Sequence, residues 1–270
     1  MAEPSAILGE LPLLSLMGPA IQGTAIIGFT LAGRLLPRVT DQALIHKDLM
    51  WNLVNGALLY PLRITLVAWV AAHSNLHLLP TDWLPGPVAQ AALAFVTLDL
   101  ARYWLHRLAH RIPTLWSFHR VHHSAERLEP TAGLRMHLVD FLLLSSLPIL
   151  LFGVLFDTSG WHPAVLPSVL AIGVFFDAFQ HANLRWNPNH PLNRAWGLVL
   201  NNPLFHSWHH TREGHLIDGN YGNTLVIWDK LLGTEVTRPV PPAAYGIQGD
   251  QALQNDPLSW QLLRTRGGAQ

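Results

Sequence analysis

Histidines gather at the ends of apolar stretches, and this arrangement constrains the fold more than any other feature of the chain. Residues 99–123 read DLARYWLHRLAHRIPTLWSFHRVHH and hold five histidines within eighteen residues. In a helix, Asp99, Tyr103, His106 and His110 are spaced i, i+4, i+7 and i+11, so they share one face. His106 and His110 are then neighbours one turn apart, close enough to bind the same metal ion. The sequence therefore predicts a helix that ends in a pair of metal ligands.

Two further sets of three histidines have the spacing i, i+3, i+4, which again places the members of each set on one side of a helix. These two histidine boxes are His119, His122 and His123, and His206, His209 and His210. Pro113 is expected to end or bend the preceding helix. Eight imidazoles are too many for one ion, because zinc sites use about four ligands and octahedral sites about six. Two ions roughly 3.5–4 Å apart are the natural number. The eight histidines predicted as ligands are His106, His110, His119, His122, His123, His206, His209 and His210.

The residues around the histidines favour redox chemistry over hydrolysis. A zinc protease of the His-Glu-x-x-His type uses the glutamate as its general base, and Arg107 holds that position here. The chain has no Gly-x-Ser-x-Gly elbow and no dinucleotide-binding Gly-x-Gly-x-x-Gly motif. Two alternatives stay open at this point: a metal-dependent lipid hydrolase, and a membrane protein that binds or transports metal. A transporter would place histidines along its membrane spans rather than at their ends.

The composition is that of a membrane protein. Apolar residues make up 50% of the chain and charged residues 13%, whereas soluble domains carry roughly 25% charge. The formal net charge is zero and there is no basic block, which argues against nucleic acid as a partner. The absence of cysteine excludes disulfides and cysteine-ligated iron–sulfur clusters. The first residues lack the basic region of a cleaved signal peptide, so the first apolar stretch is expected to stay.

Five apolar stretches could cross or enter a bilayer, which takes about 20 residues for a spanning helix. They predict an all-α fold: an integral membrane helical bundle of about four to five membrane helices with a cytoplasmic, histidine-rich helical cap. The alternative is a soluble bundle of buried helices. The last two stretches could also form a hairpin that enters and leaves on one side. The stretches are 11–33, 49–72, 88–105, 138–156 and 164–179.

Basic residues occur in every second connection between these stretches. The positive-inside rule then places the N-terminus outside and both histidine-rich regions on the cytoplasmic face of a multi-pass protein. Arg63 lies inside the second stretch. A charged residue within a membrane span is a functional candidate, although Arg63 could equally snorkel toward the membrane surface or pair within the bundle.

Several motifs resemble those of the fatty acid hydroxylase and sterol desaturase superfamily. The resemblance runs from about residue 99 to 234 and includes HRVHHS at 119–124, HSWHH at 206–210 and WDKLLGT at 228–234. It implies a non-haem di-iron centre that uses O2 and two electrons to hydroxylate or desaturate a C–H bond of a lipid. Zinc could replace iron in purified protein.

The resemblance also adds residues to the predicted site. His181 resembles an extra family histidine that helps to bind the metals. His137 resembles the histidine of a family Arg-x-His-Pro motif, although Leu138 replaces the proline; a ligand, a partner of a ligand and a structural residue are all open for it. We expect Asp99 to accept the free N–H of a ligating histidine, as such carboxylates usually do, with a salt bridge to Arg102 or Arg107 as the alternative.

No haem, flavin or iron–sulfur motif is visible, so electrons are expected from a separate partner such as a ferredoxin or a b-type cytochrome with its reductase. The other expected partner is a lipid from the bilayer. We predict a single membrane-embedded domain over residues 1–238, with the motif core at 99–234, and a C-terminal tail at 239–270. Asp256-Pro257 is expected to begin a short helix in that tail. Whether His215 is a ligand stays open.

Overall fold

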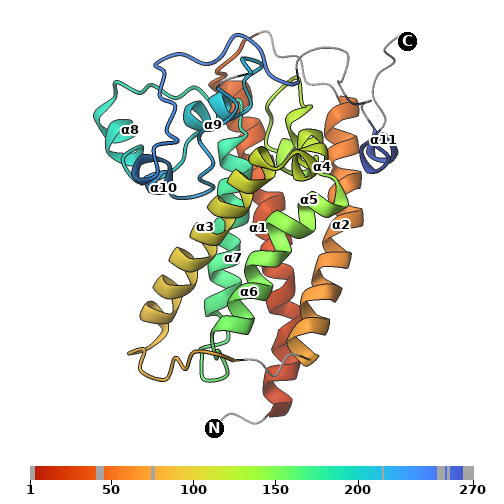
Figure 1. The fold of residues 1–270 in the computed structure, drawn as a ribbon, viewed down its shortest axis with the longest axis vertical. Coiled ribbons are helices and arrows are strands. Elements are labelled where there is room, and N and C mark those ends of the chain that lie inside the picture. The colour runs from red at the N-terminus through yellow and green to blue at the C-terminus, as the bar shows by residue number, and fades with distance from the viewer. Residues whose placement is uncertain are drawn as a thin grey trace.

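The apolar stretches form long helices that lie side by side and carry smaller helices at one end (Figure 1). The computed structural model describes residues 4–40, 46–73, 77–214, 216–247, 253 and 256–263, without the side chains of 4–17, 46–47 and 66–73. No β-strand forms within these residues, which confirms the all-α prediction. The long elements are α1 (Pro4–Leu35), α2 (His46–His73), α3 (Pro87–Arg111), the continuous run α5 (Leu138–Phe141), η2 (Leu142–Ser146) and α6 (Leu147–Leu155), and α7 (Val165–Gln180).

Each of the five predicted apolar stretches is helical. The helix α3 continues beyond its apolar part to Arg111, so it carries His106 and His110 at its end. Ile112 is extended, and Pro113 then starts α4 in a new direction, as expected for a residue that cannot continue a helix. The shorter elements are α4 (Pro113–His123), η1 (Ala132–Leu134), α8 (Pro191–Trp196), α9 (Pro203–His209), α10 (Ile227–Leu231) and α11 (Pro257–Gln261).

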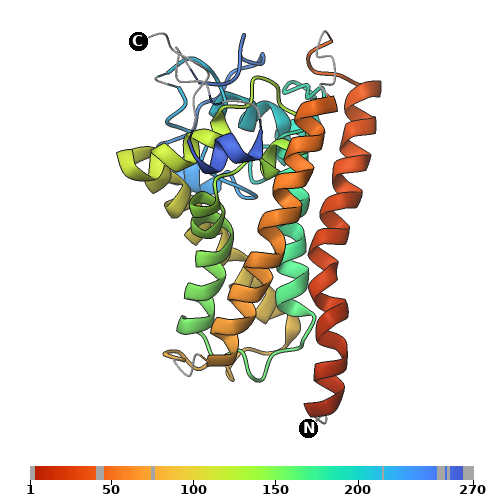
Figure 2. The same cartoon turned by 90° about the vertical axis from the view of Figure 1, so that its right-hand side faces the viewer.

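The elements α4, η1, α8, α9 and α10, with the loops at 124–137 and 181–247, form a cap over one end of the long helices. The C-terminus lies at the cap end and the N-terminus at the opposite end (Figure 1). In the view turned by 90°, α1 and α2 run side by side along one edge of the bundle (Figure 2). The cap and the long helices therefore meet in one layer, and the histidine boxes lie in that layer.

Aromatic and aliphatic side chains hold the long helices together. The Phe29 ring on α1 lies 5.2 Å from the Phe175 ring and 5.1 Å from the Phe179 ring on α7. Leu98 on α3, Phe152 on α6 and Val169 on α7 belong to one buried cluster. These contacts hold α1, α3, α6 and α7 together in one bundle.

The run from α5 to α6 contains a π-helical turn at Leu142–Ser146. Pro148 has no N–H to donate to the Leu144 carbonyl, so regular α-helical pairing is lost at this point. A π turn is a common way to absorb such a defect. It follows that this span is bent just below the cap, where Leu144 lines a cavity described below.

Large apolar side chains cover the outside of the bundle. Leu58 on α2 is 65% exposed and Ile27 on α1 is 64% exposed, and Leu151 and Ile172 continue this surface on α6 and α7. Among the described residues, one helix, Leu138–Leu155, is long and apolar enough to cross a membrane, and Val165–Gln180 is a shorter apolar helix. The number of spans thus remains the prediction made from the sequence.

The short helix α11 packs against the bundle. Asp256 caps it by accepting a hydrogen bond from the Ser259 N–H, as the Asp-Pro pair predicts. Trp260 is fully buried in a cluster with Val121 of α4 and Leu253, and the Arg135 guanidinium lies 4.4 Å from the centre of its ring. The division between a domain and a tail at residue 238 stays a prediction, but α11 contributes to the core.

We expect Trp260→Ala to destabilise the protein strongly, because removing a fully buried indole leaves a cavity and typically costs about 3–5 kcal/mol. Thermal unfolding in detergent measures the change. Trp83→Ala is the matched control, since Trp83 is 69% exposed, and it should leave the transition almost unchanged. Equal effects of the two substitutions would show that α11 does not support the bundle.

Candidate metal centre

The structure brings all nine histidines predicted as ligands together. The end of α3, helix α4, the residue after α7 and helix α9 with the residue after it supply them. Within each of two groups, the ring nitrogens lie within 4.8 Å of one another. The first histidine group is His106, His110, His119, His123 and His209, and the second histidine group is His122, His181, His206 and His210.

Each His-x-x-His-His box divides between the two groups. His119 and His123 belong to the first group, and His122 between them belongs to the second. The other box divides in the opposite sense, because only its middle histidine, His209, joins the first group. Residues four apart stack on one face of a helix, whereas an adjacent residue points about 100° away. One short helix can therefore supply ligands to two neighbouring sites.

Acceptors outside the first group fix which ring nitrogens face inward. His106 Nδ1–H donates to the Tyr221 carbonyl at 2.8 Å, and His119 Nδ1–H donates to the Asp140 carboxylate, with both oxygens at 3.0 Å. The two Nε2 atoms, left with their lone pairs, face each other at 3.1 Å. His123 Nε2 lies at the same distance from His119 Nε2. A proton on His119 Nε2 could form a hydrogen bond to only one of the other two Nε2 atoms. A cation between the three rings could bind the lone pairs of all three Nε2 atoms.

The second group repeats this arrangement. His181 Nδ1–H donates to the Asp177 carbonyl at 2.6 Å. Its Nε2 then faces His122 Nε2 at 3.3 Å and His206 Nε2 at 3.1 Å. Metal–imidazole bonds of about 2.0–2.1 Å at right angles would separate two ligand nitrogens by about 3 Å. The observed spacings therefore match neighbouring ligands in one coordination shell.

Buried ring nitrogens without a partner support the same interpretation. Among the described residues, the ring nitrogens without a hydrogen bond include the Nε2 of His209 and both nitrogens of His110, whose Nδ1 lies 3.6 Å from Asp218 Oδ1. Buried polar atoms are nearly always hydrogen-bonded, so such a concentration needs a ligand. The remaining members of this set are the Nδ1 atoms of His122, His123, His206 and His210.

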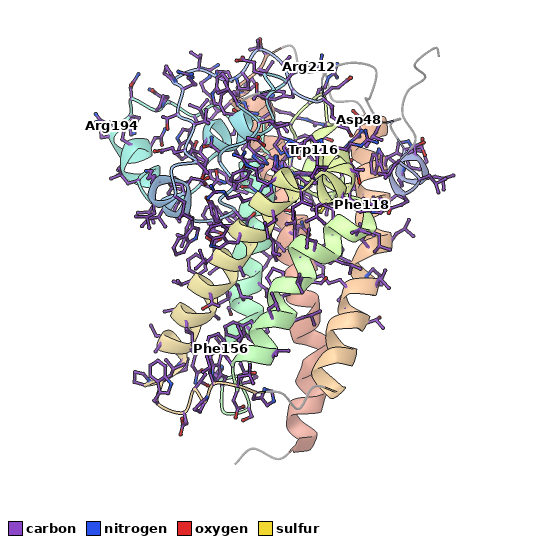
Figure 3. The ribbon with its side chains drawn as sticks, viewed as in Figure 1. Asp48, Trp116, Phe118, Phe156, Arg194 and Arg212 are labelled. Atoms are coloured by element: carbon purple, nitrogen blue, oxygen red, sulfur yellow. The ribbon has the colours of Figure 1, made fainter. Side chains whose placement is uncertain are left out.

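The cap keeps these imidazoles neutral, which is the form that binds metal. Burial lowers the pKa of His209 to about 3. Burial likewise lowers the pKa values of His122, His123, His206 and His210 well below their ordinary range. On the outside of the first group, the Trp116 ring lies 5.1 Å from the His110 ring and 5.4 Å from the His123 ring (Figure 3). The group is therefore shielded from water on the α4 side.

The loop before α10 positions His106 and His209 through its backbone. His209 Nδ1–H donates to the Gly219 carbonyl at 2.8 Å, two residues before the carbonyl that holds His106. Asp229 accepts hydrogen bonds from the N–H groups of Tyr221 and Gly222, each at 2.8 Å. The motif at 228–234 therefore acts as a support for the carbonyls that orient two ligands.

The prediction that Asp99 accepts the free N–H of a ligating histidine is wrong. Asp99 accepts hydrogen bonds from the Thr224 and Leu225 N–H groups and from Trp228 Nε1, and from no histidine among the described residues. The predicted alternative, a salt bridge with Arg102 or Arg107, is not found among those residues either. Arg102 pairs with Asp177 at 3.0 Å, and Arg107 donates to the Tyr103 hydroxyl at 3.4 Å. Asp99 lies two helical turns from His106, too far along α3 to reach its ring, and holds the cap loop on α3 instead.

His137 lies outside both histidine groups, and its contacts are those of a residue that supports the backbone. Its Nδ1 accepts a hydrogen bond from the Val139 N–H at the start of α5. Its Nε2–H donates to the Gln261 carbonyl of α11 at 3.2 Å, and its ring packs on Phe118 (Figure 3). Both nitrogens are occupied, so His137 belongs to neither group. His215 lies outside the described residues.

Sequence reasoning missed the residues that orient the ligands. Asp140 is the clearest case, because it is the only charged residue in the apolar stretch 138–156. A lone carboxylate at the start of a membrane span needs a partner, and that signal could have pointed to His119. The carbonyls of Asp177, Gly219 and Tyr221 leave no such signal, because any residue has a carbonyl.

Two adjoining cavities lie at the histidines and beneath them. The smaller one is lined by five histidines of both groups together with Arg102 and Asp177. The larger one extends between α3, α6 and α7, where Leu98, Ile149 and Val169 line it. Residues lining both cavities are Arg102, Met136, Leu144, Asp177 and Asn223.

Asp140→Asn is expected to weaken metal binding by the first histidine group about tenfold or more, the range typical for partners of ligating histidines. Because both carboxylate oxygens face His119 Nδ1–H, an amide would oppose it with an N–H of its own. Competition with a chelator measures the affinity. Asp82→Asn, at an exposed position, is the control, and unchanged affinity in Asp140→Asn would remove this role from Asp140.

Gly133→Ala is expected to damage the second histidine group. A Cβ at Gly133 would lie 2.5 Å from Asp177 Oδ2 and 3.5 Å from His181 Cε1. Overpacking of this kind typically costs about 1–3 kcal/mol, so both thermal stability and metal content should fall. Gly153→Ala is the control because nothing lies within 4 Å of its Cβ. A Gly133→Ala protein as stable and as metal-loaded as this control would contradict the packing.

Comparisons with known proteins agree with this geometry. The model of the fatty acid hydroxylase family matches residues 91–234. An ornithine lipid hydroxylase from Rhizobium tropici is 35% identical over 72% of this chain and 55% of its own length. An alkylglycerol monooxygenase from Danio rerio is 30% identical over 63% of this chain and 35% of its own length. A fatty acid hydroxylase from Lecanicillium sp is 28% identical over 63% of this chain and 48% of its own length.

The chain thus spans from about a third to just over half of the length of these curated relatives. No solved structure matches it significantly. The family match covers more than half of the chain and includes all nine histidines of the two groups. On this basis, the chain belongs to the fatty acid hydroxylase family, within the fatty acid hydroxylase and sterol desaturase superfamily.

Proposed function

We propose that the protein is a membrane-bound non-haem di-iron oxygenase that oxidises a C–H bond of a lipid with O2 and electrons from an external donor. The observation that carries this proposal is the pair of adjacent histidine groups with inward-facing nitrogens. Five and four ligands suit two ions rather than one. The relatives are named as hydroxylases and monooxygenases, which favours hydroxylation over desaturation.

The residues present fit iron. Neutral imidazole is a ligand for iron as well as for zinc and copper, and zinc can occupy such sites in purified protein. When bound, two iron ions would supply the activation of O2 for attack on a C–H bond. The residues that would hold the ions are His106, His110, His119, His122, His123, His181, His206, His209 and His210.

The cavity beneath the histidines supports a lipid substrate. Its walls at Leu98, Ile149 and Val169 are apolar, so they favour a hydrocarbon chain over water. Because this cavity shares lining residues with the one at the histidines, a chain in it can extend toward the ligands. The walls would thereby orient the substrate and exclude water from the centre. An ornithine lipid and an alkylglycerol, named in two relatives, are both amphiphiles of this general kind.

The distribution of charge supports a membrane location with the cap in the cytoplasm. The exposed apolar side chains of the bundle suit contact with lipid tails. The connections that carry arginine, including Arg34, Arg38 and Arg120, lie at the cap end (Figure 1). The connections at the opposite end lack lysine and arginine. This distribution follows the positive-inside rule and supports a cytoplasmic docking face for a ferredoxin, or for a b-type cytochrome with its reductase.

The decisive experiment is metal analysis of detergent-purified protein with a Mössbauer spectrum and a measurement of O2 consumption. We expect about two coupled irons per chain. His122→Ala and His209→Ala, one from each group, should lose metal and activity together, whereas His190→Ala, at an exposed position, should keep both. Two zincs with lipid hydrolysis independent of O2 would replace this function with the hydrolase alternative. One metal or none would favour a binding or transport protein.

The topology has its own test. A reporter fused to the C-terminus should report a cytoplasmic location, because the C-terminus lies at the cap end (Figure 1). A second reporter in the connection at 77–86 should report the opposite side of the membrane. Two reporters on the same side would overturn the proposed orientation of α2 and α3.

A further inference from the structure

Arg63 is a charged residue in the middle of α2 to which the proposed function assigns no role. It is half-buried and lines the larger cavity. Within the described part of the chain it makes no hydrogen bond or ion pair, and its guanidinium lies 5.7 Å from the centre of the Tyr60 ring. A cation in an apolar bundle is costly unless it is paired, so the missing partner calls for an explanation.

The carboxylates that line the same cavity are already engaged. Asp177 accepts from Arg102 at 3.0 Å through Oδ1, and its Oδ2 is packed against the backbone of Gly133. Asp99 accepts three hydrogen bonds from the cap loop. Arg63 therefore lines the cavity as a cation for which the described residues provide no hydrogen-bonded counterion.

Neighbouring groups add hydrogen-bonding capacity at the same wall. The Tyr60 hydroxyl donates to Gln22 Oε1, which fixes the Gln22 amide and leaves its NH2 as a donor. Gln22 and Tyr60 line the larger cavity together with Arg63. The rest of this cavity is mostly apolar, with Phe141 and Leu144 close to Tyr60. A polar wall beside an apolar cavity is the arrangement that an amphiphile requires.

The charged groups share one cavity. Arg63, Arg102 and Asp177 all line it. Arg102 and Asp177 precede His106 and His181 by four residues each, which is about 6 Å along a helix. They also line the cavity at the histidines. An anion beside Arg63 would thus lie in the cavity that adjoins the metal groups.

We propose that Arg63, with Gln22 and Tyr60, binds the anionic group of the lipid substrate, a carboxylate or a phosphate. The site selects an amphiphile with a negative charge over a neutral lipid of the same chain length. The anion supplies the counterion that α2 lacks, and the apolar walls hold the hydrocarbon chain. This inference rests on the proposed function for the identity of the lipid as substrate, but the binding site itself does not depend on turnover.

The test is equilibrium binding of three ligands with the same sixteen-carbon chain to purified protein in a neutral detergent. Palmitate carries a carboxylate, hexadecyl phosphate carries a phosphate, and hexadecanol is neutral. We expect the wild type to bind one or both anions at least about tenfold more tightly than the alcohol, a ratio typical of hydrogen bonds to charged groups. The stronger of the two anions identifies the headgroup chemistry. Equal affinity for all three ligands would overturn the proposal.

Substitutions assign the preference to Arg63. Arg63→Gln should abolish it while leaving hexadecanol binding unchanged, and Arg63→Lys should keep part of it. Arg185→Gln, at an exposed position in the cap, is the matched control and should behave as wild type. An anion preference that survives in Arg63→Gln, or an equal loss for all three ligands, would contradict the site. If Arg63→Gln is not monodisperse, Arg63→Met, which suits an apolar bundle, replaces it with the same expected results.

Failure of this inference and failure of the proposed function give different results. An anion preference that depends on Arg63 in a protein without iron or O2 consumption would leave the binding site standing and remove the oxygenase. A di-iron, O2-consuming protein in which Arg63→Gln keeps the wild-type preference would do the reverse.

Discussion

The convergence of imidazole lone pairs on two points is the constraint on which the rest of the structure depends. Nitrogens such as His106 Nε2 and His119 Nε2 face each other at 3.1 Å because acceptors behind the rings have taken their other N–H groups. That arrangement is repulsive unless cations lie between the rings. For four of the nine histidines, His106, His119, His181 and His209, an outer acceptor thus fixes which nitrogen faces the group, as in other metal sites.

Those acceptors explain why the cap has so few regular elements and yet is deeply buried. The loop before α10 has to present the carbonyls of Gly219 and Tyr221 toward two histidines. Asp229 holds this loop from within the cap, and Asp99 holds its continuation on α3. Buried carboxylates with several N–H partners hold this loop in place of a regular helix or sheet. In a helix or sheet, the carbonyls would be bonded to backbone N–H groups and could not face the histidines.

Asp177 connects the metal groups with the cavity below. Its backbone carbonyl orients His181, and its side chain pairs with Arg102 at the junction of the two cavities. Gly133 makes this possible because a side chain at that position would collide with the carboxylate. Asp177 therefore lies within one helical turn of His181, a member of the second histidine group, and also lines the cavity below.

The sequence by itself identified the nine histidines that gather in the two groups and where along the helices they lie. Spacing at i, i+3 and i+4 places His119, His122 and His123 on one side of a helix whatever the surroundings. The five apolar stretches, and the helices that begin at Pro113 and Pro257, likewise follow from the local sequence. Only the tertiary structure decided that His122 and His209 leave their own boxes for the opposite groups. It also decided that His119 pairs with Asp140 while Asp99 and His137 support the backbone. These outcomes depend on which groups distant segments bring behind each ring, and no periodicity within one helix encodes that.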